Sequence, residues 1–329
     1  MFSSILAITI EKEPMAIMRP IYAFLGYILN VLFNLAYSIT DANSLGITII
    51  VFTVLTRCLM IPSGIKSQRS MIMMRKLQPE VDAIKTKYGN SKDPEIARKM
   101  QGEIQALYSS HNYNQLGGCL PMLITLPIFI ALASILRQPY MYVDKIGTVY
   151  TELATKIMQI PGYGGILEGM KVLPEKGNMA DVNFASDLIK VLNGFTLEHW
   201  DIFKASIGDS PVLTEINAIL SQKTNFETFL GLNLLNNAGF GFPQIFIPIL
   251  SAGTQFLSAF YNFKVNPPAD PSQKSTQMMM MIGMPLFMGY LTSTMRIGVG
   301  VYWIAGNLFY FLQQVIITKY IRSKEAKTQ

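Results

Sequence analysis

Residues 45–62 read LGITIIVFTVLTRCLMIP, an apolar run whose only charged residue is Arg57. The run approaches the ~20 residues that a helix needs to cross a hydrocarbon layer about 30 Å thick. A guanidinium stays protonated, and placing it at mid-membrane costs about 2.5–3.5 kcal/mol on insertion scales. The interpretation of this segment therefore depends on what Arg57 does.

Two interpretations of Arg57 stay open from its position. Because it lies five residues before Pro62, its long side chain is able to snorkel to the cytoplasmic head groups. Alternatively, it is a functional charge that faces a water-filled cavity between helices. The apolar runs of the chain contain no Asp or Glu that could pair with it, and this absence favours the cavity.

Four further apolar runs predict a multi-pass membrane protein. Half of the 329 residues are hydrophobic and only 15% are charged, whereas soluble domains carry about 25% charged residues. We predict an all-α integral membrane protein with a five-transmembrane-helix core. After residues 45–62, the second and third transmembrane helices are 119–137 and 242–261, and the fourth and fifth together occupy 278–318.

The N-terminal segment 1–44 contains a sixth candidate, residues 20–40. This stretch is long enough to span, but Asn30, Asn34 and three tyrosines interrupt its hydropathy. Such a pattern suits a helix that lies in the plane of the membrane interface. We therefore predict an extracytoplasmic interfacial helix here, with spanning as the alternative.

The distribution of Lys and Arg between the connecting segments predicts the orientation. Segment 63–118 holds nine Lys and Arg against five acids, and segments 262–277 and 319–329 are also net positive. Segment 138–241 holds seven against eleven acids. The positive-inside rule places the first three segments in the cytoplasm, including the C-terminal tail. Segment 138–241 is then an extracytoplasmic insertion, and the N-terminal region is also outside.

Segment 63–118 has the pattern of a cytoplasmic antiparallel helical hairpin. Its first half places apolar residues every three or four positions up to Tyr88, and Gly89 then supplies a stop. Asp93 followed by Pro94 predicts the N-cap and first turn of a second helix. Packing of the two apolar stripes on each other is the simplest function of these positions. The basic residues of the first helix are candidates for contact with acidic lipids or ribosomal RNA.

Motifs of enzymes and cofactor sites are missing from the sequence. It contains no GxxxxGKS or GxxxxGKT phosphate loop, no GxSxG, no HExxH and no CxxC. With two histidines and two cysteines, a His- or Cys-rich metal site is not expected. We predict that the protein is not an enzyme and that it uses no cofactor and no metal.

Polar side chains on other spans are candidates to line a cavity around Arg57. Gln255, Trp303 and Asn307 lie within predicted helices, where they either line a cavity or bond across helices. An anion channel or transporter would also use a buried arginine. That alternative predicts inverted repeats or paired broken helices, and the sequence shows no convincing repeat.

The order of these parts resembles the YidC/Oxa/Alb family of membrane-protein insertases. IIVFTVLTRCLMIP at 49–62 resembles the family's first core helix, with Arg57 at its buried arginine. KSQRSMIMMRKLQPEVDAIKTKYG at 66–89 resembles its cytoplasmic hairpin. GGCLPMLITLPIFIAL at 117–132 and GVYWIAGNLFYFLQQ at 300–314 resemble its second and fifth core helices. The phrases cover both halves of the chain, whereas the insertion 138–241 is much longer than the family's connection at this place.

The resemblance implies a function and a site. Arg57 would lie in a hydrophilic substrate groove that is open to the cytoplasm and lipid, with Trp303 and Gln255 as matching groove residues and Asn307 as a further polar candidate. The substrates would be nascent membrane proteins, inserted into the lipid bilayer of a bacterial cell membrane. The ribosome and the Sec translocon are candidate partners, DNA is not, and the active form is expected to be a monomer.

Overall fold

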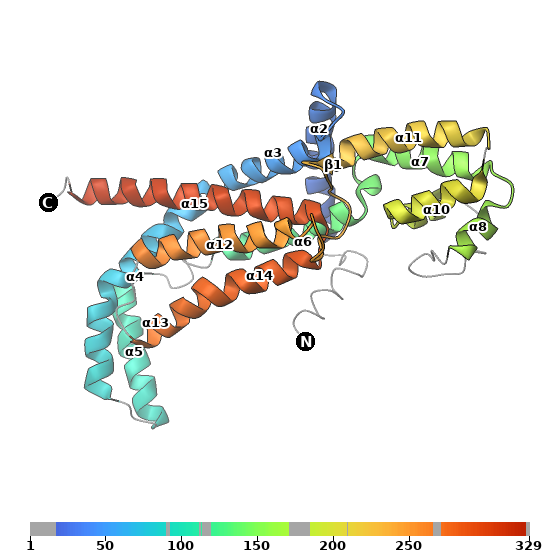
Figure 1. Cartoon of the computed structure of the whole chain (residues 1–329). Helices are drawn as coiled ribbons and strands as arrows, with labels where there is room; N and C mark the ends of the chain where they lie inside the picture. Colours follow the sequence, from blue (N-terminus) through green and yellow to red (C-terminus); the bar gives the residue numbers. More distant parts are fainter. Residues whose placement is uncertain are drawn as a thin grey trace. The chain divides into compact units, whose positions relative to one another are not determined.

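The computed structural model describes residues 18–89, 93–111, 113, 120–170, 185–208, 210–265 and 271–326. The described chain is mostly helical, with one two-stranded hairpin (Figure 1). Residues 1–17 of the predicted N-terminal segment, Cys119 and the last three residues lie outside the described part. The chain divides into two compact units, and each is described by itself below.

The first unit takes the described residues of Met1–Phe52, Ile130–Ile245 and Ser293–Val301. The second takes the described residues of Thr53–Phe129, Phe246–Thr292 and Tyr302–Gln329. Three long helices cross from one unit to the other in sequence. These are α3 (Ser44–Leu59), α6 (Leu120–Arg137) and α15 (Ile297–Ala326).

In the described residues, two single helices are long and apolar enough to cross a membrane: α2 (Arg19–Ile39) and residues Ile297–Ser323 of α15. The pair α3 and α4 (Ile61–Tyr88) passes the same test together, but is bent by 56° at the break. Shorter apolar helices occupy Ile124–Arg137 and Met279–Ser293. The helices of a membrane protein are therefore present, while the predicted number of five spans stays a prediction.

The bend between α3 and α4 follows from the sequence. Pro62 lies in the first turn of α4, where a residue without a backbone N–H breaks no helical hydrogen bond. The first predicted span 45–62 accordingly contains a helix that ends at Leu59. Arg57 lies in its last turn, where the partial negative charge of the helix end favours a cation.

The C-terminal end of α4 and the start of α5 (Pro94–Ser110) lie where the sequence predicted, whereas α4 begins at Ile61, within the predicted span 45–62. Gly89 closes α4 with a φ of +62°, a left-handed conformation that glycine adopts without steric cost. Asp93 caps α5 by accepting a hydrogen bond from the N–H of Glu95 at 2.9 Å, so its predicted N-cap role is confirmed. The Lys87 ammonium donates to Glu103 at 2.6 Å and joins the two helices; this hydrogen bond lowers the pKa of Glu103.

The rest of the second unit is also helical. Its elements are α6 (Leu120–Arg137), which begins in this unit, α12 (Phe246–Val265), the short polar helix α13 (Pro271–Met278), a π-helical turn at Met279–Gly283 and α14 (Met284–Ser293). The wide turn includes three of four consecutive methionines, whose flexible side chains adapt to irregular backbone.

The predicted insertion forms a helical cluster in the first unit. After a short 3₁₀ turn at Pro139–Met141, its elements are α7 (Asp144–Met158), α8 (Tyr163–Gly169), α9 (Ala185–Leu192), α10 (Leu197–Ile207), α11 (Val212–Glu227), β1 (Thr228–Phe229) and β2 (Leu232–Asn233). Helices α9 and α11 pack against α7, which buries Leu153, Leu188 and Ile216 completely. Removing such side chains from water supplies roughly 1.5–3 kcal/mol each.

A buried carboxylate joins α7, α11 and the β1–β2 hairpin. The side chain of Glu227 is fully buried and accepts hydrogen bonds from Lys223 at 2.7 Å, Asn233 at 3.0 Å and Tyr150 at 3.2 Å. Burial and the neighbouring carboxylate raise the pKa of Tyr150 well above its ordinary value, so the phenol stays protonated and donates. A buried carboxylate with all of these partners satisfied fixes the geometry of the cluster.

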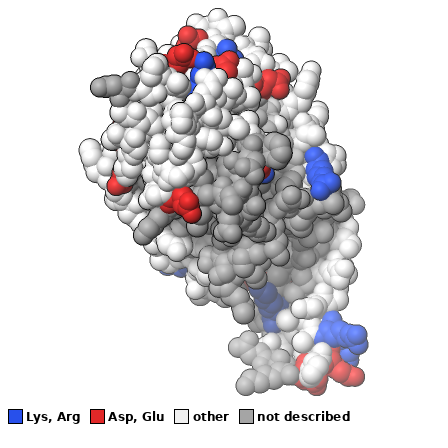
Figure 2. Space-filling model, turned by 90° about the vertical axis from the view of Figure 1, so that its right-hand side faces the viewer, with Lys and Arg blue, Asp and Glu red and all other residues white. Residues whose placement is uncertain are grey.

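Helix α2 packs on the insertion through one of its faces. The side chain of Asn30 donates to the Asp144 carboxylate at 2.7 Å and accepts from the Asp144 backbone N–H at 3.1 Å. Phe33 is fully buried and meets Phe226 edge to face at 5.8 Å between ring centroids. On the face drawn in Figure 2, the charged side chains of the described residues gather mainly in small groups, and most of the described surface carries none.

Candidate functional site

Arg57 is half-buried in the second unit, and no acidic residue in the described part of the chain forms an ion pair with it. The Nε atom is buried and has no hydrogen-bond partner among the residues that the structure describes. No ion pair to a described residue neutralises the guanidinium either. A buried cation without a protein partner requires water, carbonyl groups or an anionic ligand.

The guanidinium of Arg57 lies directly against the backbone of α15 at Gly306. A Cβ atom built on Gly306 would lie 2.7 Å from Nη2 and 3.2 Å from Nε of Arg57. Any side chain here would have to displace the charged group, so the glycine makes room for it. Sequence reasoning did not single out Gly306, because only the contact between two distant helices shows its purpose.

Two tyrosines stand one turn before and one turn after Gly306. Tyr302 and Tyr310 both lie close enough to Arg57 to interact with its charge. Residues four apart lie on one face of a helix, so α15 presents Tyr302, Gly306 and Tyr310 to the arginine as one stripe.

Trp303 and Asn307 lie on the neighbouring stripe of α15, where Trp303 packs against α6 and Asn307 is hydrogen-bonded to α12. The Trp303 ring meets Phe129 of α6 edge to face at 5.0 Å, and its indole N–H is buried without a partner among the described residues. The side chain of Asn307 donates to the hydroxyl of Thr254 on α12 at 3.2 Å. The Ser258 hydroxyl donates to the backbone carbonyl of Asn307 at 3.4 Å. Asn307 thus joins α12 to α15, which is one of the two roles that the sequence left open for it.

Gln255 follows Thr254 on α12 and is half-buried. Within the described ranges its side chain makes no hydrogen bond, to Arg57 or to any other residue. The structure thus brings Gly306 and two tyrosines to Arg57, and connects Asn307 to α12. Among the described residues no hydrogen bond or ring contact joins Gln255 or Trp303 to the arginine, and their place in a groove stays a prediction.

Further contacts continue from Arg57 along α4 and α15. Gly64 packs against the amide of Gln313, and Gln68 donates to the Thr318 hydroxyl at 3.0 Å. The residue numbers on both helices rise together along these contacts, so the two segments run parallel.

Buried polar atoms without partners gather in this unit. Besides Arg57 Nε and Trp303 Nε1, they belong to Ser63, Glu103, Ser251, Asn262, Gln277 and Gln314, which are on α4, α5, α12, α13 and α15. The Gln314 side chain is only 2% exposed, and its amide makes no well-aligned hydrogen bond to a described residue, although the Tyr310 hydroxyl lies within its reach. Buried polar groups are normally hydrogen-bonded, and those that lack protein partners are the usual positions of ordered water.

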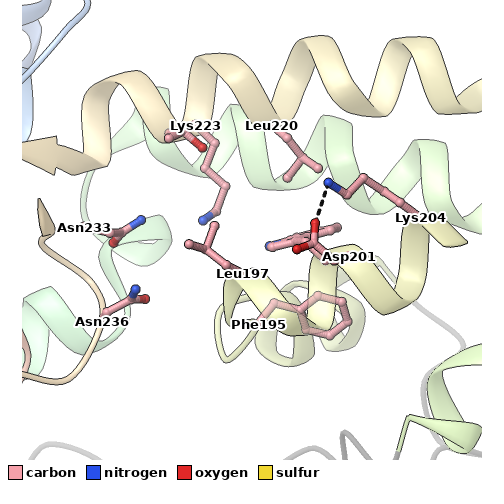
Figure 3. Close-up of a pocket in the computed structure, with 10 residues that line it drawn as sticks. Phe195, Leu197, Asp201, Lys204, Leu220, Lys223, Asn233 and Asn236 are labelled. Atoms are coloured by element: carbon pink, nitrogen blue, oxygen red, sulfur yellow. Dashed lines mark ion pairs between the residues drawn. The ribbon is translucent and has the colours of Figure 1, made fainter. Parts of the chain in front are cut away.

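A separate pocket of about 110 Å³ lies in the first unit between α10, α11 and the loop after β2 (Figure 3). Its charged groups already have partners: Lys204 pairs with Asp201 at 2.9 Å and Lys223 with Glu227 at 2.7 Å. These pairs leave no charge for a ligand, and we assign no function to the pocket. Among the described residues there is also no group of three or more potential metal ligands.

Comparison with known proteins extends over nearly the whole chain. The family described as 60Kd inner membrane protein matches residues 36–325. Membrane protein insertase YidC 1 of Bacillus cereus is 26% identical over 288 residues, which cover 87% of this chain and 76% of the relative. Membrane protein insertase YidC of Fusobacterium nucleatum is 40% identical over 117 residues, 35% of this chain and 51% of the relative. The protein of that name from Rickettsia africae is 28% identical over 280 residues, 84% of this chain but 36% of the relative.

The apolar helices and these matches define an integral membrane protein of the insertase class, which is not an enzyme. The chain belongs to the 60Kd inner membrane protein family, the YidC/Oxa family of membrane protein insertases. The family resemblance noted in the sequence is confirmed. The matched residues include Arg57 and Gly306.

Proposed function

We propose that the protein inserts nascent membrane proteins by drawing their outer tails into a water-containing groove around Arg57. One observation carries the proposal: a half-buried cation has no partner among the described residues, and the same unit holds further buried polar atoms that also lack a described partner. Acidic or polar groups of a client tail are attracted to this charge and cross part of the bilayer in a polar environment. Arg57, Trp303, Asn307 and Gln255 form the groove in this proposal.

Hydrophobic partitioning supplies the driving force. Each central Leu, Ile, Phe or Val favours the membrane by about 0.3–0.6 kcal/mol on insertion scales, so an apolar segment of ~20 residues releases several kcal/mol. The groove lowers the barrier for the polar tail, and the apolar segment then moves into lipid. No nucleotide is required.

Reconstitution tests this function. Purified full-length protein in lipid vesicles should insert a single-span client with a short acidic tail, without nucleotide and well above the level in empty vesicles. The same vesicles should not conduct chloride. Chloride flux without client insertion would instead support the anion channel or transporter.

The five-span topology belongs to the same proposal. Residues 63–118, 262–277 and 319–329 are cytoplasmic, and 138–241 are outside. The parallel run of α4 and α15 supports the cytoplasmic placement of the C-terminal tail, because it brings the C-terminal end of α15 to the same side as the α4–α5 hairpin. We further propose that the protein acts as a monomer, and that the basic hairpin face meets the ribosome or the Sec translocon.

Helix α2 is proposed to lie at the outer interface, although its length and apolar character would allow it to span. Its middle residue Asn30 is bonded to Asp144, so a spanning α2 would draw this carboxylate toward the bilayer centre. Its other face exposes apolar side chains, among them Phe24, Tyr27 and Leu35. One face on the insertion and one on lipid is the arrangement of an interfacial helix.

Cysteine labelling checks the topology. In a background with Cys58 and Cys119 replaced by Ser, Lys87→Cys and Glu198→Cys are exposed to a membrane-impermeant thiol reagent in intact cells. Only the second should react, whereas both should react after lysis. Equal labelling of both positions in intact cells would contradict the map.

A further inference from the structure

The turn between β1 and β2 has an unusual residue at its tip. The strands pair antiparallel, and the two turn residues Leu230 and Gly231 have φ angles of +50° and +79°. Turns with two positive φ angles strongly favour Asn-Gly or Asp-Gly, because the left-handed conformation is costly for a residue such as leucine. The Leu230 side chain is nevertheless 82% exposed. Neither the left-handed backbone nor exposure to water favours leucine at this position, which points to an apolar environment outside the protein.

The β1–β2 hairpin is fixed to one end of the first predicted span. The ring of Phe229, next to the tip, packs on Gly46 in the first turn of α3. In the proposed topology, this turn is the outer end of the first transmembrane helix. The chain therefore holds Leu230 close to the outer surface of the membrane.

A second loop, residues 238–242, also exposes apolar side chains, both of them aromatic. Phe240 is 63% and Phe242 82% exposed. The loop is tied to the turn between α14 and α15 by backbone hydrogen bonds from Ala238 to Met295 at 2.9 Å and from Gly239 to Ser293 at 2.8 Å. That turn joins the fourth and fifth predicted spans on the outer side, so this loop also lies at the membrane surface.

We propose that Leu230, Phe240 and Phe242 enter the outer leaflet of the bilayer and anchor the insertion 138–241 to the membrane. Both loops lack charged residues over 228–233 and 238–242, and aromatic side chains favour the membrane–water interface. Two separate loops, each fastened to the outer end of a span, suit a continuous lipid surface better than a discrete protein partner. This anchor requires the proposed topology but not the insertase activity.

Lipid-depth quenching tests the anchor in the full-length protein. Single cysteines replace Leu230 or Phe240 in the background without Cys58 and Cys119, and carry an environment-sensitive fluorophore. The protein is reconstituted in phosphatidylcholine vesicles that contain lipids spin-labelled near the head group or deep in the acyl chain. The control is Gln159→Cys, which is exposed at the end of α7 remote from α2.

Labels at 230 and 240 should be quenched severalfold more than the label at 159 by the shallow spin label, and less by the deep one. Quenching at 230 and 240 no stronger than at 159 would overturn the proposal. Protection from aqueous iodide without quenching by lipid would also overturn it, since another protein surface, such as a second copy, would then cover these residues.

A variant without a label gives an independent measurement. Leu230→Asn suits the left-handed turn and removes the apolar side chain. Its melting temperature should match or exceed that of the parent protein in detergent, and fall below it in vesicles. The same change in both media would mean that Leu230 acts within the fold, and would contradict the anchor.

Discussion

Arg57→Glu should abolish insertion of clients with acidic outer tails, Arg57→Ala should reduce it at least about tenfold, and Arg57→Lys should retain much of it. Two unit charges about 4 Å apart attract by ~4 kcal/mol at an effective dielectric constant of 20, and a loss of only ~1.4 kcal/mol from the barrier already changes a rate tenfold. Lysine keeps the charge but not the planar fork of arginine. The measurement is insertion into reconstituted vesicles at matched protein levels.

The client supplies the control for this series. Removing acids from its outer tail should weaken the dependence on residue 57, because the attraction then has no partner. If Arg57→Ala inserts acidic-tailed and neutral-tailed clients equally well at normal abundance, the electrostatic mechanism is wrong and snorkelling is the better interpretation. A strict requirement for arginine over lysine would instead indicate bidentate bonding.

Local signals in the sequence predicted local structure well. Gly89, Asp93 and Pro94 mark the ends of α4 and α5, because caps and helix starts depend on neighbouring backbone groups only. The family could be identified for a similar reason, since several phrases along the chain carry it. Arg57 could be singled out from the sequence because a charge inside an apolar run is costly however the helices pack.

Features that depend on contacts between distant segments could not be predicted. The arrangement of the insertion depends on buried groups such as Glu227, whose partners Tyr150 and Lys223 come from two helices. Gly306 is one of 24 glycines, and only the position of α15 beside Arg57 distinguishes it. The tilt of α4 against α3 follows from Pro62, but the sequence does not state its angle.

Gly306→Leu should inactivate the protein about as strongly as Arg57→Ala while the fold persists. The added side chain would occupy the place of the guanidinium, whose nearest atom lies 2.7 Å from the position of a Cβ. That atom is the end of a flexible side chain, so Arg57 is able to swing away without disturbing the helix backbones. Replacing a helical glycine also gains up to ~1 kcal/mol of helix propensity. Insertion activity and melting temperature should therefore separate, with activity lost and stability kept.

Two further variants decide whether Gly306 acts through Arg57. Gly253→Leu on α12 is the matched control, because a Cβ there would meet no described atom within 4 Å, and it should leave insertion unchanged. In the Arg57→Ala background, Gly306→Leu should cause little additional loss, since residues that act as one unit are not additive. Independent losses that multiply in the double variant would show that Gly306 serves the packing of α15 alone. Non-additive losses at full stability would place the charge and the glycine in one functional site, formed where α3 ends against the middle of α15.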